Sequence, residues 1–207
     1  VRAALGGPLP HEPTAPSLVV EQLVQAARPG LMGTPGPRFF GFVIGGALPS
    51  ATAADMLAAG WDQCAFNAVL SPAAAAAEDV AGDWLKELLG IPATASVGFV
   101  TGAQAANTVG LACARHHVLS EVGWDVELKG LQAAPRVRVV AGEERHATVD
   151  RSLRLLGLGS DVVEPVRADA NGAIDVGHLE QVLGAGDGPT IVCLQAGNVN
   201  TGACDDL

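Results

Sequence analysis

The residues best suited to chemistry lie in the segment SVGFVTGAQAAN, which ends at Asn107. Its apolar residues 97–100 predict a buried strand, and the small residues that follow predict a tight turn into an Ala-rich helix. The first amides of such a helix are free, and they point, with the positive end of the helix dipole, at one spot. The turn Thr101–Gln104 therefore predicts a phosphate cradle, with an ordinary strand-to-helix turn as the alternative.

His146 follows the next predicted strand, within the segment GEERHATVDRSLRLLGLG. Its flat imidazole could stack on another planar ring and hold that ring in place. A phosphate cradle combined with a stacking ring indicates a phosphorylated aromatic cofactor, for which pyridoxal 5'-phosphate is the candidate. The alternative is a solvated or capping histidine at a helix N-terminus.

A third polar segment, QAGNVNTGACD, follows the last predicted strand. Asn198 and Asn200 in this loop could bond to a cofactor or a substrate, or the loop could satisfy only its own backbone. The adjacent carboxylates Glu143–Glu144 and Asp205–Asp206 are expected to be solvated, and we do not interpret them as an acid–base dyad.

The elements that must position these residues alternate between strand and helix from residue 91 onward. This alternation predicts an α/β fold with a mostly parallel sheet flanked by helices and right-handed crossovers. Ligands bind such sheets beyond the carboxyl ends of the strands, where all three candidate segments lie. The predicted strands are 97–100, 135–141, 161–166 and 190–195, and the predicted helices are 103–119, 146–156 and 175–183.

Residues 1–90 predict an N-terminal arm followed by a helical segment. Helices are expected at 17–28, with Ser17 as its N-cap, at 51–60 and at 72–89, with residues 31–49 irregular. The expected domains are thus 1–90, and 91–207 as an incomplete first part of a cofactor-binding α/β domain.

Composition limits the partners that the chain could have. Its net charge of −10 opposes binding to nucleic acids or anionic membranes. No uninterrupted apolar run approaches the roughly 18 residues of a membrane span. The four cysteines are scattered without a CxxC pair, which favours neither disulfides nor structural zinc and leads us to expect a reduced, cytoplasmic location.

Five blocks of the chain, in order, resemble the N-terminal half of the pyridoxal-phosphate-dependent group II amino-acid decarboxylases, which include aromatic-amino-acid and glutamate decarboxylases. The resemblance covers nearly the whole chain from Pro37. It implies the large domain of the aspartate-aminotransferase-type fold (fold type I) and a homodimer with active sites at the subunit interface. The blocks are FFGFVIGGALPSATAADML, SPAAAAAEDVAGDWLKELLGIP, GFVTGAQAAN, ERHATVDRSLRLLGLG and QAGNVNTGACDDL.

The resemblance also implies roles for individual residues. His146 would be the catalytic residue that stacks on the pyridine ring, and Phe42 and Ile44 would line the substrate pocket. Gln104 departs from the Ser or Thr that is more frequent at the phosphate position. The implied cofactor-binding residues are Thr101, Gly102, Ala103, Gln104, His146, Asn198 and Asn200.

The Schiff-base lysine of the family lies in an Asp-x-His-Lys type motif, which is absent here, as is the His-x-Asp-Gly-Ala type motif whose aspartate pairs with the pyridine nitrogen. The only lysines, Lys86 and Lys129, lie elsewhere. We therefore expect a piece of a longer amino-acid decarboxylase, inactive alone, whose parent releases an amine and CO₂. The apolar region 39–44 favours an aromatic or other apolar amino acid as the substrate.

Three alternatives stay open. The parent could be another fold type I lyase, aldolase or aminotransferase. The chain could be a truncated, non-catalytic homologue that acts as a binding or dimerisation partner. A nucleotide-binding α/β domain would fit the same order of elements, but the chain lacks the GxGxxG and GxxxxGK[ST] fingerprints.

Overall fold

The computed structural model describes residues 1–206. The chain divides into two compact units, Val1–Gln63 and Cys64–Leu207. Helix α4 (Pro72–Leu89) lies before the domain boundary expected at residue 90 but is part of the second unit. The division into functional domains at that boundary stays a prediction.

The first unit contains α1 (Arg2–Leu5), α2 (Pro16–Ala27), α3 (Pro49–Trp61) and two short 3₁₀ turns, Arg28–Gly30 and Gly41–Val43. The two longer helices confirm the predictions for 17–28 and 51–60. The N-cap expected at Ser17 is wrong, because Pro16 takes the first helical position, where its missing N–H costs nothing, and Ala15 precedes it without a side-chain cap.

The second unit begins with α4, which starts and ends as its sequence predicts. The hydroxyl of Ser71 accepts a hydrogen bond from the amide of Ala74 at 3.3 Å, and Gly90 ends the helix with a φ of 67°. Lys86 then donates to the carbonyl oxygens of Ala93 at 3.0 Å and Ala95 at 3.3 Å. These bonds hold the turn that leads to residues 97–100.

Residues 97–100 do not form the strand that their apolar sequence predicts. They lie in extended coil without a ladder partner among the described residues, and Phe99 is 49% exposed. An apolar run becomes a strand only where a neighbouring strand supplies hydrogen-bond partners, and the described part of the chain places none beside it.

A parallel sheet in the described part of the chain confirms the other predicted strands, although each is shorter than expected. The strands β1 (Arg138–Gly142), β2 (Val163–Val166) and β3 (Thr190–Cys193) lie in the order β2-β1-β3. Val139 of β1 pairs with Val163 on one side and Ile191 on the other. Val139 and Val140 of the central strand are both fully buried, on opposite faces, because helices cover both faces.

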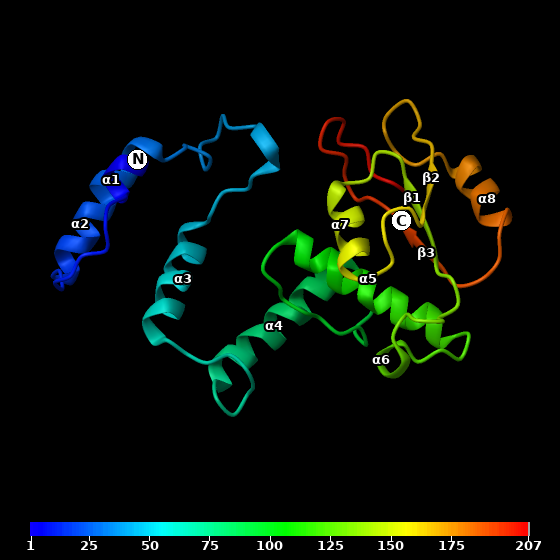
Figure 1. Ribbon diagram of the computed structural model, residues 1–207, viewed down its shortest axis with the longest axis horizontal. Helices are drawn as coiled ribbons and strands as arrows, with labels where there is room; N and C mark the ends of the chain where they lie inside the picture. The colour runs from blue at the N-terminus through cyan, green and yellow to red at the C-terminus, as the bar shows by residue number, and fades with distance from the viewer. Residues whose placement is uncertain (207) are drawn as a thin grey trace. The chain divides into compact units, whose positions relative to one another are not determined.

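Alternate residues of β1 belong to two separate cores. Val139 packs with Leu111 of α5 (Ala103–Ser120) and Leu153 of α7 (Ala147–Leu155), whereas Val140 packs on the other face below α8 (Val176–Gly184). Figure 1 shows α5 and α7 on one side of the strands and α8 on the other. These helices confirm the predictions for 103–119, 146–156 and 175–183.

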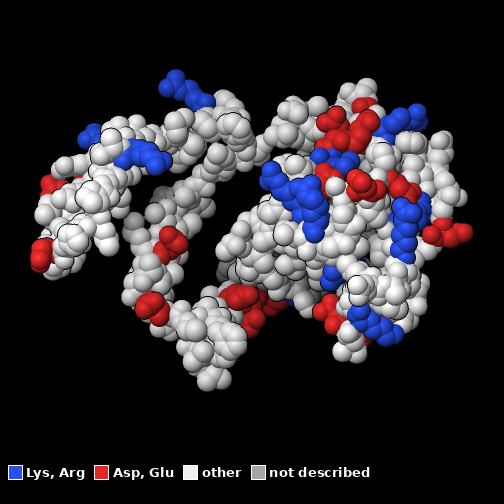
Figure 2. Space-filling view, in the orientation of Figure 1, with Lys and Arg blue, Asp and Glu red and all other residues white. Residues whose placement is uncertain are grey.

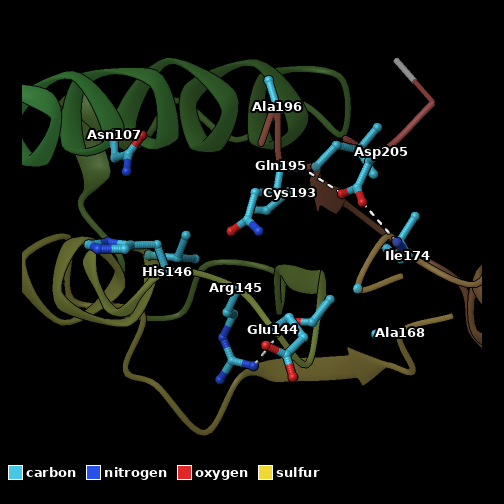
Figure 3. Close-up of a pocket in the computed structure, with 14 residues that line it drawn as sticks. Asn107, Glu144, Arg145, His146, Ala168, Ile174, Cys193, Gln195, Ala196 and Asp205 are labelled. Carbon is cyan, nitrogen blue, oxygen red and sulfur yellow. Dashed lines mark hydrogen bonds between the residues drawn. The ribbon is translucent and has the colours of Figure 1, made fainter. Parts of the chain in front are cut away.

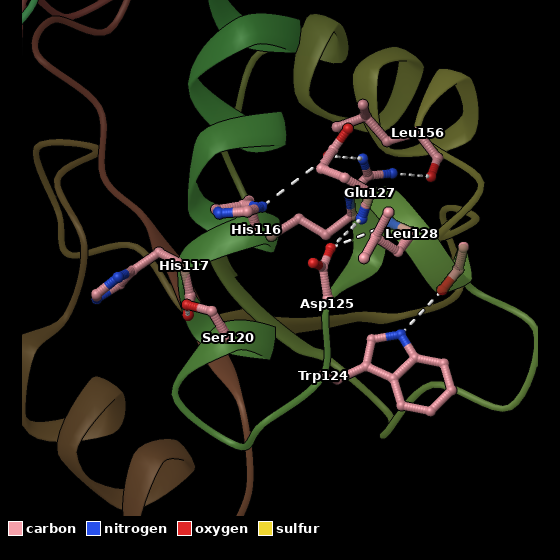
Figure 4. Close-up of polar contacts among 10 residues, drawn as sticks. His116, His117, Ser120, Trp124, Asp125, Glu127, Leu128 and Leu156 are labelled. Atoms are coloured by element: carbon pink, nitrogen blue, oxygen red, sulfur yellow. Dashed lines mark hydrogen bonds and ion pairs between the residues drawn. The ribbon is translucent and has the colours of Figure 1, made fainter.

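The C-terminal end of α5 is fixed by polar contacts that the sequence does not reveal (Figure 4). Arg115 donates to the carbonyl oxygen of Leu156 at 3.0 Å and lies 3.9 Å from Glu127 of the short helix α6 (Val126–Lys129). The indole of Trp124 donates to the carbonyl oxygen of Gly130 at 2.9 Å. These contacts join α5 to α7 and α6, so the helix that begins at the candidate cradle is anchored at its far end.

Candidate functional site

His146 lies at the start of α7, immediately beyond the loop that follows β1. Its Nδ1 accepts a hydrogen bond from the backbone amide of Thr148 at 3.3 Å, so His146 is the N-cap of the helix. The preceding residue, Arg145, donates from Nη2 to Asp150 at 2.9 Å and from Nε at 3.3 Å. This ion pair spans the first turn of α7 and stabilises the backbone at His146, which carries the imidazole.

The turn before α5 leaves backbone amides free at a helix N-terminus. Gly102, the N-cap, has a φ of 99°, a conformation that residues with a Cβ rarely adopt. Within residues 1–206, no carbonyl or side chain accepts a hydrogen bond from the amides of Ala103 and Gln104. Two free amides at the N-terminus of an 18-residue helix fit the phosphate of pyridoxal phosphate.

The side chain of Gln104 points to α7. Its Nε2 donates to the carbonyl oxygen of Thr148 at 3.3 Å and to the hydroxyl of Ser152 at 2.8 Å. Its Oε1 is buried and has no donor among the described residues. The part of Gln104 that is free to bind a phosphate is therefore its backbone amide.

A second contact between α5 and α7 brings His146 close to the cradle helix. Asn107 donates from Nδ2 to the hydroxyl of Thr148 at 2.7 Å, and the same hydroxyl lies 2.9 Å from Nδ1 of His146. Asn107 lies one helical turn beyond Ala103. The imidazole is thus connected to the second turn of α5 through a single hydroxyl.

A cavity of about 200 Å³ lies where β1 and β3 end. Gly142 of β1 and Cys193 of β3 both line it, so it lies at the predicted edge of the sheet. His146 lies at one end of the cavity, at the start of α7, and Asp205 and Ile174 lie at the opposite end (Figure 3). Thr101, Gly102 and Ala103 are not among the residues that line it.

Asn198 and Asn200 lie in the loop beyond β3 and do not line this cavity. The side-chain oxygen of Asn198, which is 7% exposed, accepts from the amides of Asn200 at 2.8 Å and Thr201 at 3.3 Å. This is an Asx-type turn in which Asn198 orders its own loop. Direct bonds from either asparagine to a cofactor stay a prediction.

Asp205 is a buried site residue that sequence reasoning missed. It is 8% exposed, and its two carboxylate oxygens accept from the amides of Ile174 at 2.8 Å and Gln195 at 2.7 Å. The expectation of a solvated pair is wrong for Asp205 and holds for the exposed Asp206. Glu143 is exposed but also bonded, because it accepts from the amide of Ala168 at 2.8 Å. No local signal separates these carboxylates, since their partners are distant in sequence.

Cys193, at the end of β3, lines the cavity. Burial raises the pKa of the thiol, and the nearby positive charge of Arg145 opposes this only in part. The thiol at the end of β3 is therefore protonated at neutral pH.

Phe42 and Ile44 lie in the first unit, at the 3₁₀ turn Gly41–Val43. Phe42 is 90% exposed and has a φ of 60°, which is unusual for a bulky residue, and Ile44 is 48% exposed. Their place in a substrate pocket stays a prediction.

The charge on the second unit and the hydropathy of the helices bear on what the protein could bind. Figure 2 shows positive and negative side chains interleaved over the Cys64–Leu207 unit. In the described part of the chain, we find no helix whose length and apolar character would let it cross a bilayer.

Comparison with known proteins identifies relatives of one kind. The chain is 27% identical over 207 residues to tryptophan decarboxylase 1 of Oryza sativa subsp. japonica, an alignment that covers 92% of the chain and 40% of that protein. It is 30% identical over 175 residues to an aromatic-L-amino-acid decarboxylase of Bacillus atrophaeus, covering 83% of the chain and 34% of that protein. The chain therefore spans about two fifths of the length of such relatives.

Solved structures share the fold. The glutamate decarboxylase domain of diaminobutyrate-pyruvate transaminase and L-2,4-diaminobutyrate decarboxylase from Vibrio parahaemolyticus superposes with a TM-score of 0.90 at 24% identity, covering 99% of this chain and 46% of that one. Oryza sativa TDC, solved with PLP and tryptamine, gives 0.83 at 25% identity, covering 99% and 44%.

The sequence model described as the pyridoxal-dependent decarboxylase conserved domain matches residues 4–207. A match over nearly the whole chain identifies the cofactor of the family as pyridoxal phosphate. The chain belongs to the pyridoxal-dependent decarboxylase family.

Proposed function

We propose that this chain forms the N-terminal part of the cofactor site of a decarboxylase that converts an L-amino acid to its amine and CO₂. The observation that supports this most directly is the convergence of two elements. The free amides of Ala103 and Gln104 begin α5, and the same helix is joined through Asn107 and Thr148 to the ring of His146.

Different residues of the chain would bind different parts of the cofactor. The amides of Ala103 and Gln104 would bind the phosphate with the positive end of the α5 dipole. His146 would lie against the pyridine ring and keep it in one plane. When bound, pyridoxal phosphate supplies an electron sink for the carbon that loses CO₂.

The substrate that we propose is an aromatic or other apolar L-amino acid. The Phe39–Ile44 segment, which the sequence resemblance assigns to the substrate pocket, is apolar, and its exposed Phe42 and Ile44 offer apolar surface. Two relatives named for tryptophan and aromatic amino acids agree with this choice. We further propose a cytoplasmic homodimer with the site at the subunit interface.

The test uses the complete natural polypeptide that contains this sequence, purified and reconstituted with pyridoxal phosphate. We expect a visible absorbance band from the bound cofactor, and equal release of CO₂ and amine from aromatic amino acids in a panel. His146→Ala should weaken cofactor binding, whereas His117→Ala, on an exposed position of α5, should not. Failure of the complete protein to bind the cofactor, or consumption of amino acid without CO₂, would refute the proposal.

The 207-residue chain alone should not decarboxylate amino acids, because neither Lys86 nor Lys129 lines the cavity beside His146. Lys86 is bonded to the carbonyl oxygens of Ala93 and Ala95, and Lys129 lies over the ring of Trp124 at 5.0 Å. Catalysis by the isolated chain would contradict this part of the proposal.

A further inference from the structure

The hydroxyl of Thr148 lies between two polar side chains of the site. Asn107 Nδ2 is 2.7 Å from it on one side, and His146 Nδ1 is 2.9 Å from it on the other. Thr148 is only 8% exposed, so water has little access to this hydroxyl. The three side chains form a short chain of hydrogen bonds that begins on α5 and ends on the imidazole.

The positions of the protons in this series of hydrogen bonds follow from one backbone group, the amide of Thr148. The amide of Thr148 donates to Nδ1 of His146 at 3.3 Å, and an N–H can donate only to a ring nitrogen that carries no proton. The hydroxyl of Thr148 then also donates its proton to Nδ1. It has no second proton to offer, so it must accept from Asn107, which turns the NH₂ of the Asn107 amide toward it.

With Nδ1 accepting two hydrogen bonds, the proton of the neutral ring lies on Nε2. We infer that Asn107 and Thr148 are positioning residues that set His146 as the Nε2–H tautomer and fix the plane of its ring. Their role toward the cofactor rests on the proposed function. Within it, His146 presents a hydrogen-bond donor at Nε2 to a bound cofactor or substrate, and it cannot accept a proton there while the chain of bonds is intact.

A second hydroxyl contact between the same helices provides a matched control. Thr108 lies next to Asn107 on α5, and its hydroxyl is 2.9 Å from that of Ser152 on α7. Thr108→Val removes a hydroxyl from the same helix interface, as Thr148→Val does, but it touches neither His146 nor Thr148.

The first measurement is the tautomer of His146 in the complete polypeptide freed of cofactor, by ¹⁵N NMR of histidine-labelled protein, with His146→Gln to assign the signal. We expect the Nε2–H tautomer in the wild-type protein and in Thr148→Ser. Thr148→Val should shift the signal toward a mixture of tautomers, and Thr108→Val should leave it unchanged. A wild-type Nδ1–H tautomer would overturn the inference, as would a Thr148→Val signal identical to wild type.

The second measurement is the affinity for pyridoxal phosphate. Thr148→Val should weaken binding by about tenfold, the loss expected for one hydrogen bond, and Thr148→Ser should restore it. The tautomer is read without cofactor, so a protein that binds no pyridoxal phosphate refutes the proposed function and leaves the tautomer assignment standing. A protein that binds it with His146 protonated at Nδ1 refutes the inference alone. If Thr148→Val does not fold, the wild-type tautomer still decides, because an Nδ1–H ring overturns the inference.

Discussion

Replacement of Asp205 by alanine should loosen one end of the cavity without unfolding the protein. Its carboxylate accepts hydrogen bonds from the amides of Ile174 and Gln195, which belong to two different segments. A hydrogen bond to a charged acceptor contributes about 1.5–3 kcal/mol, so two such bonds contribute about 3–6 kcal/mol. Because Asp205 lines the cavity, water can enter and satisfy part of the loss, which favours the lower figure, about 3 kcal/mol.

The assay is hydrogen exchange followed by mass spectrometry on peptides that contain Ile174 and Gln195. A local loss of about 3 kcal/mol corresponds to a roughly hundredfold faster exchange of these two amides. Asp205→Asn keeps one oxygen acceptor but places an NH₂ group against the other amide, so it should accelerate exchange by an intermediate factor. Asp206→Ala is the control, since Asp206 is exposed and makes no side-chain hydrogen bond within residues 1–206.

The refuting result is specific to the two amides. If both exchange in Asp205→Ala at the rate found in Asp206→Ala, the carboxylate does not hold the two segments together, and its burial has another cause. If exchange accelerates equally across β1 and α5, the substitution has unfolded the unit, and the local role assigned to Asp205 is wrong.

Three further predictions concern the framework of the site. The hydrogen bonds from Arg138, at 2.9 and 2.6 Å, hold the pKa of Glu164 below its usual value. Glu164→Gln should therefore be less stable than wild type near neutral pH, and the difference should vanish as pH falls through the folded pKa of Glu164. Urea unfolding at a series of pH values measures this difference. Because burial raises the pKa of the Cys193 thiol, iodoacetamide should modify it after the three exposed cysteines, which a time course of peptide masses would show; simultaneous modification would contradict its burial. Leu153→Ala should cost about 2–5 kcal/mol of unfolding free energy because Leu153 is fully buried, whereas Leu155→Ala, 72% exposed, should cost less than about 0.5 kcal/mol.

The elements were largely predictable because their signals are local. Ser71 and Gly90 bound α4 through a side-chain cap and a left-handed residue, and both signals lie within a few positions of the helix. The consecutive apolar residues Val139–Ala141 of β1 likewise indicate a strand covered on both faces. The strand predicted at 97–100 is wrong for the same reason. An apolar run indicates that a segment can pair with a strand, but it does not indicate whether a partner strand is present.

The directions of the site side chains could not be predicted in this way. The sequence predicts that Gln104 contacts a phosphate, and it does not reveal that the side-chain amide of Gln104 donates to residues 44 and 48 positions away. The sequence predicts Asp205 to be solvated like its exposed neighbour Asp206, whereas the fold places the amide of Ile174, 31 positions away, against its carboxylate. The direction of each side chain depends on which distant segment the fold places next to it. The residue types themselves are compatible with an exposed side chain and with one that is bonded to another segment.

The interface between α5 and α7 unites the two halves of the candidate site before any ligand binds. Leu111 and Leu153 form its apolar part, and Gln104 and Asn107 add hydrogen bonds to α7 close to the cradle. Because the candidate cradle begins one helix and His146 begins the other, this packing would set the separation between a phosphate bound at the cradle and the imidazole of His146. A site held in this way loses less conformational entropy on binding than one whose halves must first assemble. Substitutions at the helix interface should therefore weaken cofactor affinity even where they touch neither the cradle nor the ring.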